Sequence, residues 1–203
     1  MPIRAAATTV LWRDGAEGLQ VLMGQRGAQA AFMPSKYVFP GGAVDSDDAK
    51  GETNIALHPR CLGRLRLNCP ADAPQPDALA TAALRELWEE TGLQLARAPT
   101  GEFPLRFVFR AITPPGRSRR FDARFFLVNA ASIIGDPHDF SAASDELSHL
   151  HWIGLSSARS LDLPFITEVV LSEIGHVLQQ GSQDDGVPFF DNSGPVPAFR
   201  RLV

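Results

Sequence analysis

The sequence is poor in cysteine and has no long apolar run. Cys61 and Cys69 are the two cysteines in 203 residues, too few for a disulfide-stapled scaffold, which predicts a reducing, cytoplasmic setting. No stretch approaches the roughly 18 apolar residues that a membrane-spanning helix needs. The short apolar segment RAAATTVLW near the start runs directly into RDG, so we expect a first strand there and no cleaved leader.

The sequence also lacks an excess of positive charge. Nineteen lysines and arginines against 23 aspartates and glutamates give a formal net charge of −4. This balance provides no long-range attraction for a nucleic-acid polymer or an anionic membrane. We therefore expect a small charged ligand accompanied by a metal ion, and we leave a homodimer open. With 44% hydrophobic residues, the chain is expected to bury one core as a single domain, residues 1–203.

Hydrophobic patterning predicts strands at both ends of a long central helix. The helix is expected at 77–91, with Asp77 as its N-cap and Gly92 just past its end. Its apolar stripe is expected to consist of Ala80, Leu84, Leu87 and Trp88. A hairpin is predicted over 5–12 and 19–25, aromatic-rich strands in PLRFVFRAIT and FDARFFLVNA, a short strand in LHWIGL, and an amphipathic helix over 164–180.

Two segments are expected to lie outside this regular pattern. Residues 43–76 mix Asp, Gly, Pro and Arg and predict a long insertion with one short helix around 56–65. Loops of this length inside compact domains are uncommon and often functional. The residues from 182 to 203 are rich in Pro and Gly, and we expect an extended tail.

The stretch RELWEETGL, Arg85 to Leu93, places three glutamates on one helix face. Glu86, Glu89 and Glu90 project within about 100° of arc, because residues three and four apart are neighbours on a helix. Repulsion costs about 0.2–0.5 kcal/mol per like-charged pair, and the helix dipole disfavours each acid at this end by about 0.3–1 kcal/mol. A bound divalent cation would resolve the conflict, so we predict a metal site.

This stretch resembles the second half of the Nudix box, G-x5-E-x7-R-E-U-x-E-E-x-G-U, where U is apolar. The matching residues are Arg85, Glu86, Leu87, Glu89, Glu90, Gly92 and Leu93. YVFPGG, from Tyr37 to Gly42, resembles the loop that opens the box. The resemblance implies an α/β (α+β) fold, a Nudix-type αβα sandwich with a mixed central sheet. It also implies a Nudix pyrophosphohydrolase, a diphosphatase that hydrolyses a nucleoside diphosphate linked to another group.

The first half of the box is split. Gly42 lies 43 positions before Arg85, against 14 in the uninterrupted pattern, so about 29 residues are inserted. The first glutamate of the box is then replaced by Asp77, Glu52 or Asp48, among which we favour Asp77. A split at this point resembles the Nudix branch that includes coenzyme A diphosphatases.

The resemblance implies a role for each residue that matches the motif. It implies that Glu86, Glu89 and Glu90 bind Mg²⁺ or Mn²⁺ together with the Gly41 carbonyl, and that Arg85 orients the catalytic Glu89. Oxygen ligands suit these cations, which neutralise charge on phosphate oxygens and make water nucleophilic.

Further site residues are expected outside the motif. The loop SAASDELSHLHW offers Asp145 and Glu146, and we expect Glu146 to act as the additional catalytic acid or base found in the family. The substrate is expected to contact Arg26, Arg64 and Arg120. Arg64 lies in the insertion, which leaves one end of the metal loop and returns at the metal-binding helix, so we expect the insertion to form a wall of the pocket.

The sequence alone leaves several candidate substrates. Only Arg26 fits the arginine pair in the upstream signature of the coenzyme A branch, so coenzyme A stands beside ADP-ribose, dinucleotides and nucleotide sugars as candidates. The alternative to an enzyme is a non-catalytic Nudix-fold module that binds or senses a nucleotide, since the first half of the box is broken. The complete glutamate set favours the enzyme.

Overall fold

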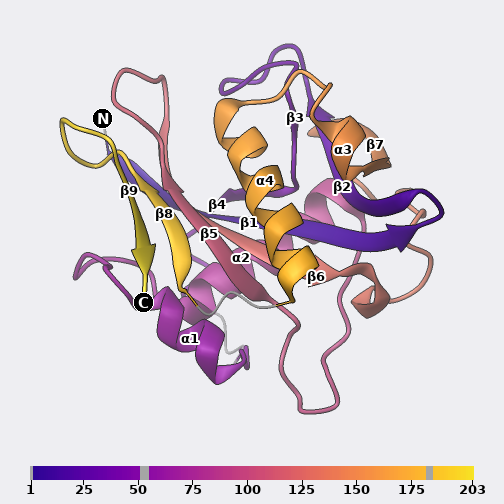
Figure 1. Cartoon of the computed structure of the whole chain (residues 1–203), viewed down its shortest axis with the longest axis horizontal. Helices are drawn as coiled ribbons and strands as arrows, with labels where there is room; N and C mark the ends of the chain where they lie inside the picture. Colours follow the sequence, from indigo (N-terminus) through magenta and orange to yellow (C-terminus); the bar gives the residue numbers. More distant parts are fainter. Residues whose placement is uncertain (1, 51–54, 182–184) are drawn as a thin grey trace.

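The computed structural model describes residues 2–50, 55–181 and 185–203 (Figure 1). In chain order, its elements are β1 (Ile3–Gly15), β2 (Gly18–Arg26), β3 (Tyr37–Val38), β4 (Gly41–Ala43), α1 (Pro59–Leu65), α2 (Pro76–Thr91), β5 (Arg106–Ile112), β6 (Arg120–Asn129), η1 (Ala130–Ser132), β7 (Leu147–Gly154), α3 (Leu155–Ala158), α4 (Phe165–Gln180), β8 (Val187–Asp191) and β9 (Ala198–Leu202). Within these ranges nine strands form one sheet in the order β3-β2-β1-β6-β5-β8-β9, with β4 on β1 and β7 on β2.

The sheet is mixed because β1 pairs in both directions. It runs antiparallel to β2, with Trp12 opposite Val21, and antiparallel to β4, with Thr8 opposite Gly41. On its other edge it runs parallel to β6, with Thr8 opposite Phe125. Strand β1 has 13 residues, of which the first half pairs with β4 and the second half pairs with β2. The predicted N-terminal hairpin is confirmed.

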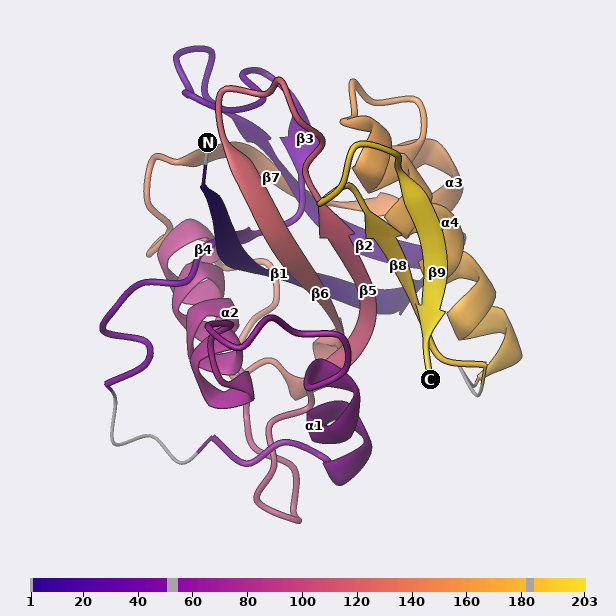
Figure 2. The ribbon, with the colours of Figure 1, turned by 90° about the vertical axis from the view of Figure 1, so that its left-hand side faces the viewer.

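Alternate residues of the central strands face two separate helical layers, as the strand period of two requires. Ala7 and Leu11 of β1 share a buried cluster with Leu87 of α2, whereas Val10 shares one with Val170 of α4. Figure 2 shows the sheet between α2 and α1 on one side and α4 on the other. The predicted αβα sandwich with a mixed central sheet is confirmed.

Helix α2 starts one residue earlier than expected and ends where expected. Gln75 is the N-cap and Pro76 occupies the first turn, so the prediction of Asp77 as N-cap is wrong. Proline suits this place because its missing N–H would have no helical partner there. Gly92 ends the helix with φ 73°, and its N–H donates to the Trp88 carbonyl at 2.8 Å.

The apolar stripe of α2 is confirmed in its middle and wrong at its end. Ala80 and Leu87 are buried and Leu84 packs partly against the same cluster, but Trp88 is 42% exposed. At about 100° per residue, Trp88 and Glu90 flank the buried line on opposite sides. The helix is turned so that Glu90, 1% exposed, faces the protein in place of the tryptophan.

The insertion is fastened to the sheet by a buried ion network. Arg110 on β5 donates to both carboxylate oxygens of Asp122 on β6, at 2.8 and 2.7 Å, and to the backbone carbonyl of Asn68 at 2.9 Å. Arg124 reaches the same carboxylate at 2.9 Å. Because buried charges are costly unless paired, this network holds the segment after α1 in one place on the sheet.

The C-terminal residues join the sheet. Strand β8 runs parallel to β5, with Arg110 opposite Phe189, and β9 runs antiparallel to β8. The extended backbone expected here is present, but the hairpin was not predicted. In the described ranges, no helix is long and apolar enough to cross a membrane.

Candidate active site

The three glutamates lie on the last turns of α2, beside β4. The N–H of Gly41 in β4 donates to Glu90 Oε2 at 2.7 Å, and this carboxylate is buried. The side chain of Glu86 is 12% exposed and that of Glu89 is 52% exposed. The three acids therefore differ in exposure, from the buried Glu90 to the half-exposed Glu89, and the Gly41 N–H fixes the buried one.

Arg85 links these acids to the start of the insertion. Its Nη1 lies 2.8 Å from Glu86 Oε1 and 3.2 Å from Glu89 Oε2. Its Nε and Nη2 donate to the two carboxylate oxygens of Asp48 at 3.0 and 2.9 Å, and Nη2 also donates to the Ala43 carbonyl at 3.1 Å. A guanidinium has the planar fork needed for such bidentate binding, so Arg85 can set the positions of two glutamates at once.

The structure identifies the acid that pairs with Arg85 as Asp48. Asp48 is buried in the turn that follows β4, where its Oδ2 also accepts the Asp45 N–H at 2.7 Å. Asp77, which we favoured as the replacement for the first glutamate of the box, is exposed in the first turn of α2, about 12 Å before Arg85 at 1.5 Å per residue, so the contact with Arg85 favours Asp48 for that place. Glu52 lies outside the described residues.

Burial controls the protonation of the inner acids. Desolvation raises the pKa of Glu90 to about 8, although the Gly41 N–H opposes the shift, and the Glu86 charge adds to it. Desolvation likewise raises the pKa of Glu86 against the pull of Arg85. At Asp48 desolvation is again the largest single effect and acts to raise the pKa, but the hydrogen bonds from Arg85 and the Asp45 N–H, together with the Arg85 charge, outweigh it and lower the pKa.

These shifts predict that the metal-free protein loses stability as the pH rises from 5 to 8. Between its ordinary pKa of 4.5 and about 8, Glu90 binds a proton in the folded state that the unfolded state has released, so the free energy of unfolding falls with pH. The slope from this group is at most about 1.4 kcal/mol per pH unit. Denaturant titrations in EDTA measure it. Glu90→Gln should flatten the profile, and a flat wild-type profile contradicts the prediction.

A cavity of about 710 Å³ opens beside the glutamates. Its acidic members on α2 and in the loop before β7 are Glu86, Glu89, Glu90 and Glu146. Its aromatic members include Phe32, Phe121, Phe165 and Phe190. Its basic members include Arg26, Arg117 and Arg119. The volume falls in the range of small-molecule sites, about 300–1,000 Å³, and the lining combines acids, aromatic rings and cations.

Small side chains on one face of the sheet create this space. Thr8 on β1 and Ala123 on β6 line the cavity, whereas Val10 and Leu127, two and four residues further along the same face, are packed under α4. Residues two apart on a strand share a face. One part of this sheet face therefore packs against α4 in the core, and the neighbouring part lines the cavity.

Glu146 belongs to a loop that rests on the end of α2. The Ser144 N–H donates to the Glu89 carbonyl at 2.7 Å. A Cβ at Gly92 would come within 3.1 Å of Ala142, which shows how closely this loop approaches the helix end. Glu146 lines the cavity and raises the pKa of Glu86 and Glu90 as a minor cause.

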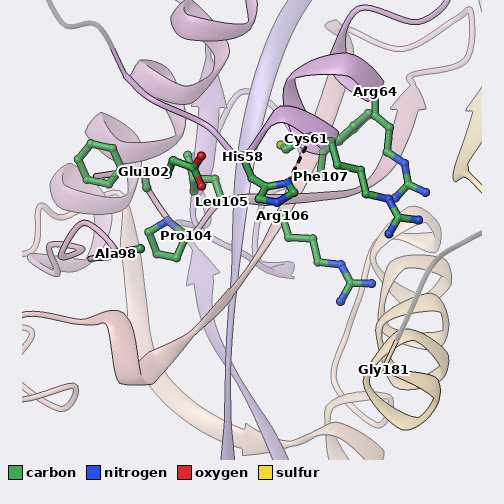
Figure 3. Close-up of a pocket in the computed structure, with 12 residues that line it drawn as sticks. His58, Cys61, Arg64, Ala98, Glu102, Pro104, Leu105, Arg106, Phe107 and Gly181 are labelled. Atoms are coloured by element: carbon green, nitrogen blue, oxygen red, sulfur yellow. Dashed lines mark hydrogen bonds between the residues drawn. The ribbon is translucent and has the colours of Figure 1, made fainter. Parts of the chain in front are cut away.

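The three arginines expected to bind substrate occupy three different environments. Arg26 lines the cavity, and its buried Nε has no hydrogen-bond partner among the described residues. Arg120 donates to the carbonyls of Thr113 and Asn192 at 2.9 and 2.7 Å, which ties the β5–β6 connection to the C-terminal hairpin. Arg64 on α1 lines a separate cavity of about 410 Å³ (Figure 3).

The insertion meets the larger cavity with its first residues. Asp45 lines it, and Asp48 lies behind it on Arg85. The short helix α1 lines the smaller cavity with His58, Cys61 and Arg64, as Figure 3 shows. The insertion therefore reaches the glutamates through its aspartates, while its arginine-bearing helix sits elsewhere.

The donor set fits a hard divalent cation that keeps much of its water. The acids at the end of α2 offer oxygen atoms, which Mg²⁺ and Mn²⁺ prefer. Within the described part of the chain, no three acidic, histidine or cysteine side chains are already arranged to hold an ion. Mg²⁺ typically uses one or two carboxylates plus waters and substrate phosphates rather than a complete protein cage, so an open acidic wall suits it.

Gly42 is predicted to be required for the position of Glu86. A Cβ on Gly42 would lie 2.3 Å from Glu86 Oε1, so Gly42→Ala must push this carboxylate away. We expect Mn²⁺ affinity to fall by about 10–100-fold, and stability to change by less than about 1 kcal/mol because the displaced group ends a flexible side chain. Calorimetric Mn²⁺ titration tests this, with Gly194→Ala as the control, since no atom of the described residues lies within 4 Å of a Cβ placed there. Unchanged affinity contradicts it.

Sequence reasoning named one site residue without preferring it and missed another. Asp48 was one of three candidate acids, but it is one of the four residues of DSDD, and its pairing with Arg85 joins positions 37 residues apart. Phe32 approaches Phe121 edge-on at 5.2 Å between ring centroids. We did not assign Phe32 to the site, although its place in the aromatic-rich segment FMPSKYVFPGGAV that leads to the glycine pair is the signal that could have pointed to it.

Comparison with known proteins agrees with this geometry. The family model described as NUDIX domain matches residues 59–171, more than half of the chain. The chain is 27% identical over 182 residues to "Putative nudix hydrolase 7" of Caenorhabditis elegans, covering 71% of this chain and 52% of that protein. It is 35% identical over 101 residues to "Acyl-coenzyme A diphosphatase NUDT19" of Gallus gallus, covering 40% and 26%. The chain thus spans about half the length of these relatives or less.

Solved structures share the fold. A NUDIX hydrolase from Alicyclobacillus acidocaldarius has a TM-score of 0.60 and 29% identity, over 85% of this chain and 90% of that one. The NUDIX domain of Shewanella oneidensis NrtR, crystallised with ADP ribose, has a TM-score of 0.55 and 14% identity, over 88% and 90%. Nudix hydrolases generally use divalent metal ions and act on nucleoside diphosphates linked to another group. The chain belongs to the Nudix family.

Proposed function

We propose that this protein is a metal-dependent hydrolase that cleaves the diphosphate bond of a nucleoside diphosphate linked to another group. The products are a nucleoside monophosphate and a phosphorylated second product. The observation that carries the proposal is the glutamate cluster of α2, ordered by Arg85 and lining a cavity of about 710 Å³. This arrangement combines clustered acids with space for a nucleotide.

The three glutamates of α2 are the proposed metal ligands. Glu86, Glu89 and Glu90 would hold Mg²⁺ or Mn²⁺, with the Gly41 carbonyl as a further ligand. The bound cation would neutralise charge on the phosphate oxygens and make water nucleophilic. Arg85 keeps Glu86 and Glu89 in place by direct hydrogen bonds.

Two side chains outside α2 complete the proposed site. Glu146 lines the cavity and is the candidate to accept the proton of the attacking water, for which a carboxylate is suited. Arg26 lines the cavity with a buried, unbonded Nε and is the candidate to bind a phosphate oxygen. Arg64 and Arg120 were expected to share this task, and their contacts favour roles in the second cavity and in fastening the C-terminal hairpin.

The substrate candidates are coenzyme A, ADP-ribose, dinucleotides and nucleotide sugars. Coenzyme A is supported by the similarity to a protein named as an acyl-coenzyme A diphosphatase, and ADP-ribose by a structural neighbour crystallised with ADP ribose. We further propose that residues 1–203 form one domain. A cytoplasmic setting is supported by the two cysteines, both free thiols.

The alternative is a Nudix-fold module that binds a nucleotide without cleaving it. The break in the motif motivated this alternative, and Asp48 in place at Arg85 weighs against it. Incubating the protein with the candidate panel plus Mg²⁺ or Mn²⁺, with product identification by mass spectrometry, separates the two. Release of a nucleoside monophosphate that requires added metal supports the enzyme, whereas tight binding without turnover of any candidate contradicts it.

A further inference from the structure

The cavity contains two arginines that the proposed chemistry does not use. Arg117 and Arg119 lie in the β5–β6 connection, are exposed, and line the same cavity as the glutamates. Neither forms an ion pair with any residue in the described part of the chain. Their charges are available to a ligand.

Most other cations of this cavity have an acidic partner, and Arg26 is assigned above to the scissile diphosphate. Arg4 pairs with Asp45 at 3.6 Å, and Lys36 pairs with Asp162. Arg85 is occupied by the acids of the proposed metal site. The β5–β6 connection therefore stands out as the rim segment that carries two cations without an acid beside them.

Contacts between two loops hold this segment against the cavity. Ser118, between the two arginines, donates from its hydroxyl to the Ala31 carbonyl at 3.3 Å. One residue further along the β2–β3 loop, Phe32 packs edge-on against Phe121 with 5.2 Å between ring centroids. The loop pair thus places an aromatic wall next to the arginines, which suits a ligand with both a planar ring and an anionic group.

The strand register separates this rim from the glutamates. Gly41, which binds Glu90, lies level with Thr8 of β1, and β6 begins at Arg120, level with Ile3. Five residues of strand correspond to about 16 Å at about 3.3 Å per residue. Long arginine side chains shorten that gap, but an anion that they bind is a different group from the diphosphate at the glutamates.

We infer that Arg117 and Arg119 bind a second anionic group of the substrate, a phosphate monoester apart from the scissile diphosphate. The substrate class is then a nucleoside diphosphate ester that carries this additional phosphate. Guanidinium groups bind phosphate oxygens in pairs of parallel hydrogen bonds, and two of them suit a dianion. The inference rests on the proposed function for the orientation of the substrate, and it concerns recognition at the far end of the same cavity.

Matched ligand pairs test it. Coenzyme A and 3′-dephospho-coenzyme A, ADP-ribose 2′-phosphate and ADP-ribose, and NADPH and NADH each differ by one phosphate monoester. Calorimetry with Mg²⁺, on protein carrying Glu89→Gln so that turnover is suppressed, gives the ratio of dissociation constants within each pair. We expect the phosphate-bearing member of one or more pairs to bind about tenfold more tightly, and the double variant R117Q/R119Q to reduce this ratio to about twofold or less.

Three controls make the outcome specific. R117K/R119K should retain part of the preference because the charge stays, and R159Q, an exposed arginine away from the cavity, should retain all of it. Ratios near one in all three pairs, or a preference that survives R117Q/R119Q, overturn the inference. Hydrolysis by the wild type is measured separately, so that failure to cleave any ligand contradicts the proposed function while the binding ratio still decides this inference.

Discussion

Replacing Glu89 or Glu90 by glutamine is expected to lower turnover by about 10²–10⁴-fold. A divalent cation contributes several kcal/mol to the transition state of phosphoryl chemistry, and each 1.4 kcal/mol corresponds to about tenfold in rate. Each substitution removes one negative charge from the glutamate cluster of α2, and this negative charge is what would bind the cation. The Glu90 variant also removes the acid that the Gly41 N–H fixes. Steady-state kinetics with Mg²⁺ and with Mn²⁺ measure the loss.

Stability in EDTA distinguishes a functional from a structural role for these acids. Without metal, removing a buried carboxylate whose pKa is raised to about 8 should leave the fold intact or slightly more stable at pH 8, because an amide carries no charge to desolvate. Glu17→Gln, an exposed glutamate in the β1–β2 turn, is the matched control and should affect neither property. A large loss of metal-free stability at Glu89 or Glu90 would show that the acids serve the fold.

Asp48→Asn is expected to lower turnover by about 10–100-fold although Asp48 does not line the cavity. Partners that orient metal-binding side chains typically contribute this much. The substitution leaves the Arg85 fork bound to one oxygen instead of two, so Arg85 is less well placed to hold Glu86 and Glu89. Arg85 keeps Glu86 and Glu89 as acidic partners but loses a charge-assisted hydrogen bond to a buried acid, so we expect the free energy of unfolding to fall by about 1–3 kcal/mol.

A double-mutant cycle with Arg85→Lys tests whether the two residues act together. Lysine keeps the charge but loses the planar fork, so each single variant should already have lost most of the coupling. The double variant should then lose much less activity than the product of the two single losses. Independent effects would show that Asp48 acts on the site by another route. Asp77→Asn is the control, since Asp77 lies exposed at the other end of α2.

Local sequence was sufficient wherever short-range physics decides the outcome. The hairpin at 5–25, helix α2 with its glycine stop, and helix α4 follow from strand and helix periodicity and from Gly92 and Gly181, which end the helices in left-handed conformations. The spacing of the three glutamates likewise determines that they share one side of α2, because helix geometry leaves no alternative. That spacing and electrostatic repulsion motivated the prediction of a bound cation, and the resemblance to the Nudix box supplied the ligand roles.

Tertiary structure decided which acid pairs with Arg85, how α2 is rotated, and where the cavity lies. Asp48 and Asp77 are equally good acids in sequence, and only the turn after β4 brings Asp48 within hydrogen-bond distance. The burial of Glu90 and the exposure of Trp88 depend on the angle at which the helix meets the sheet, which periodicity leaves free by tens of degrees. Arg117 and Arg119 reach the glutamates' cavity because β1 pairs with both β4 and β6. Long-range pairing of this kind depends on the fit of the whole core, so no local window of sequence encodes it.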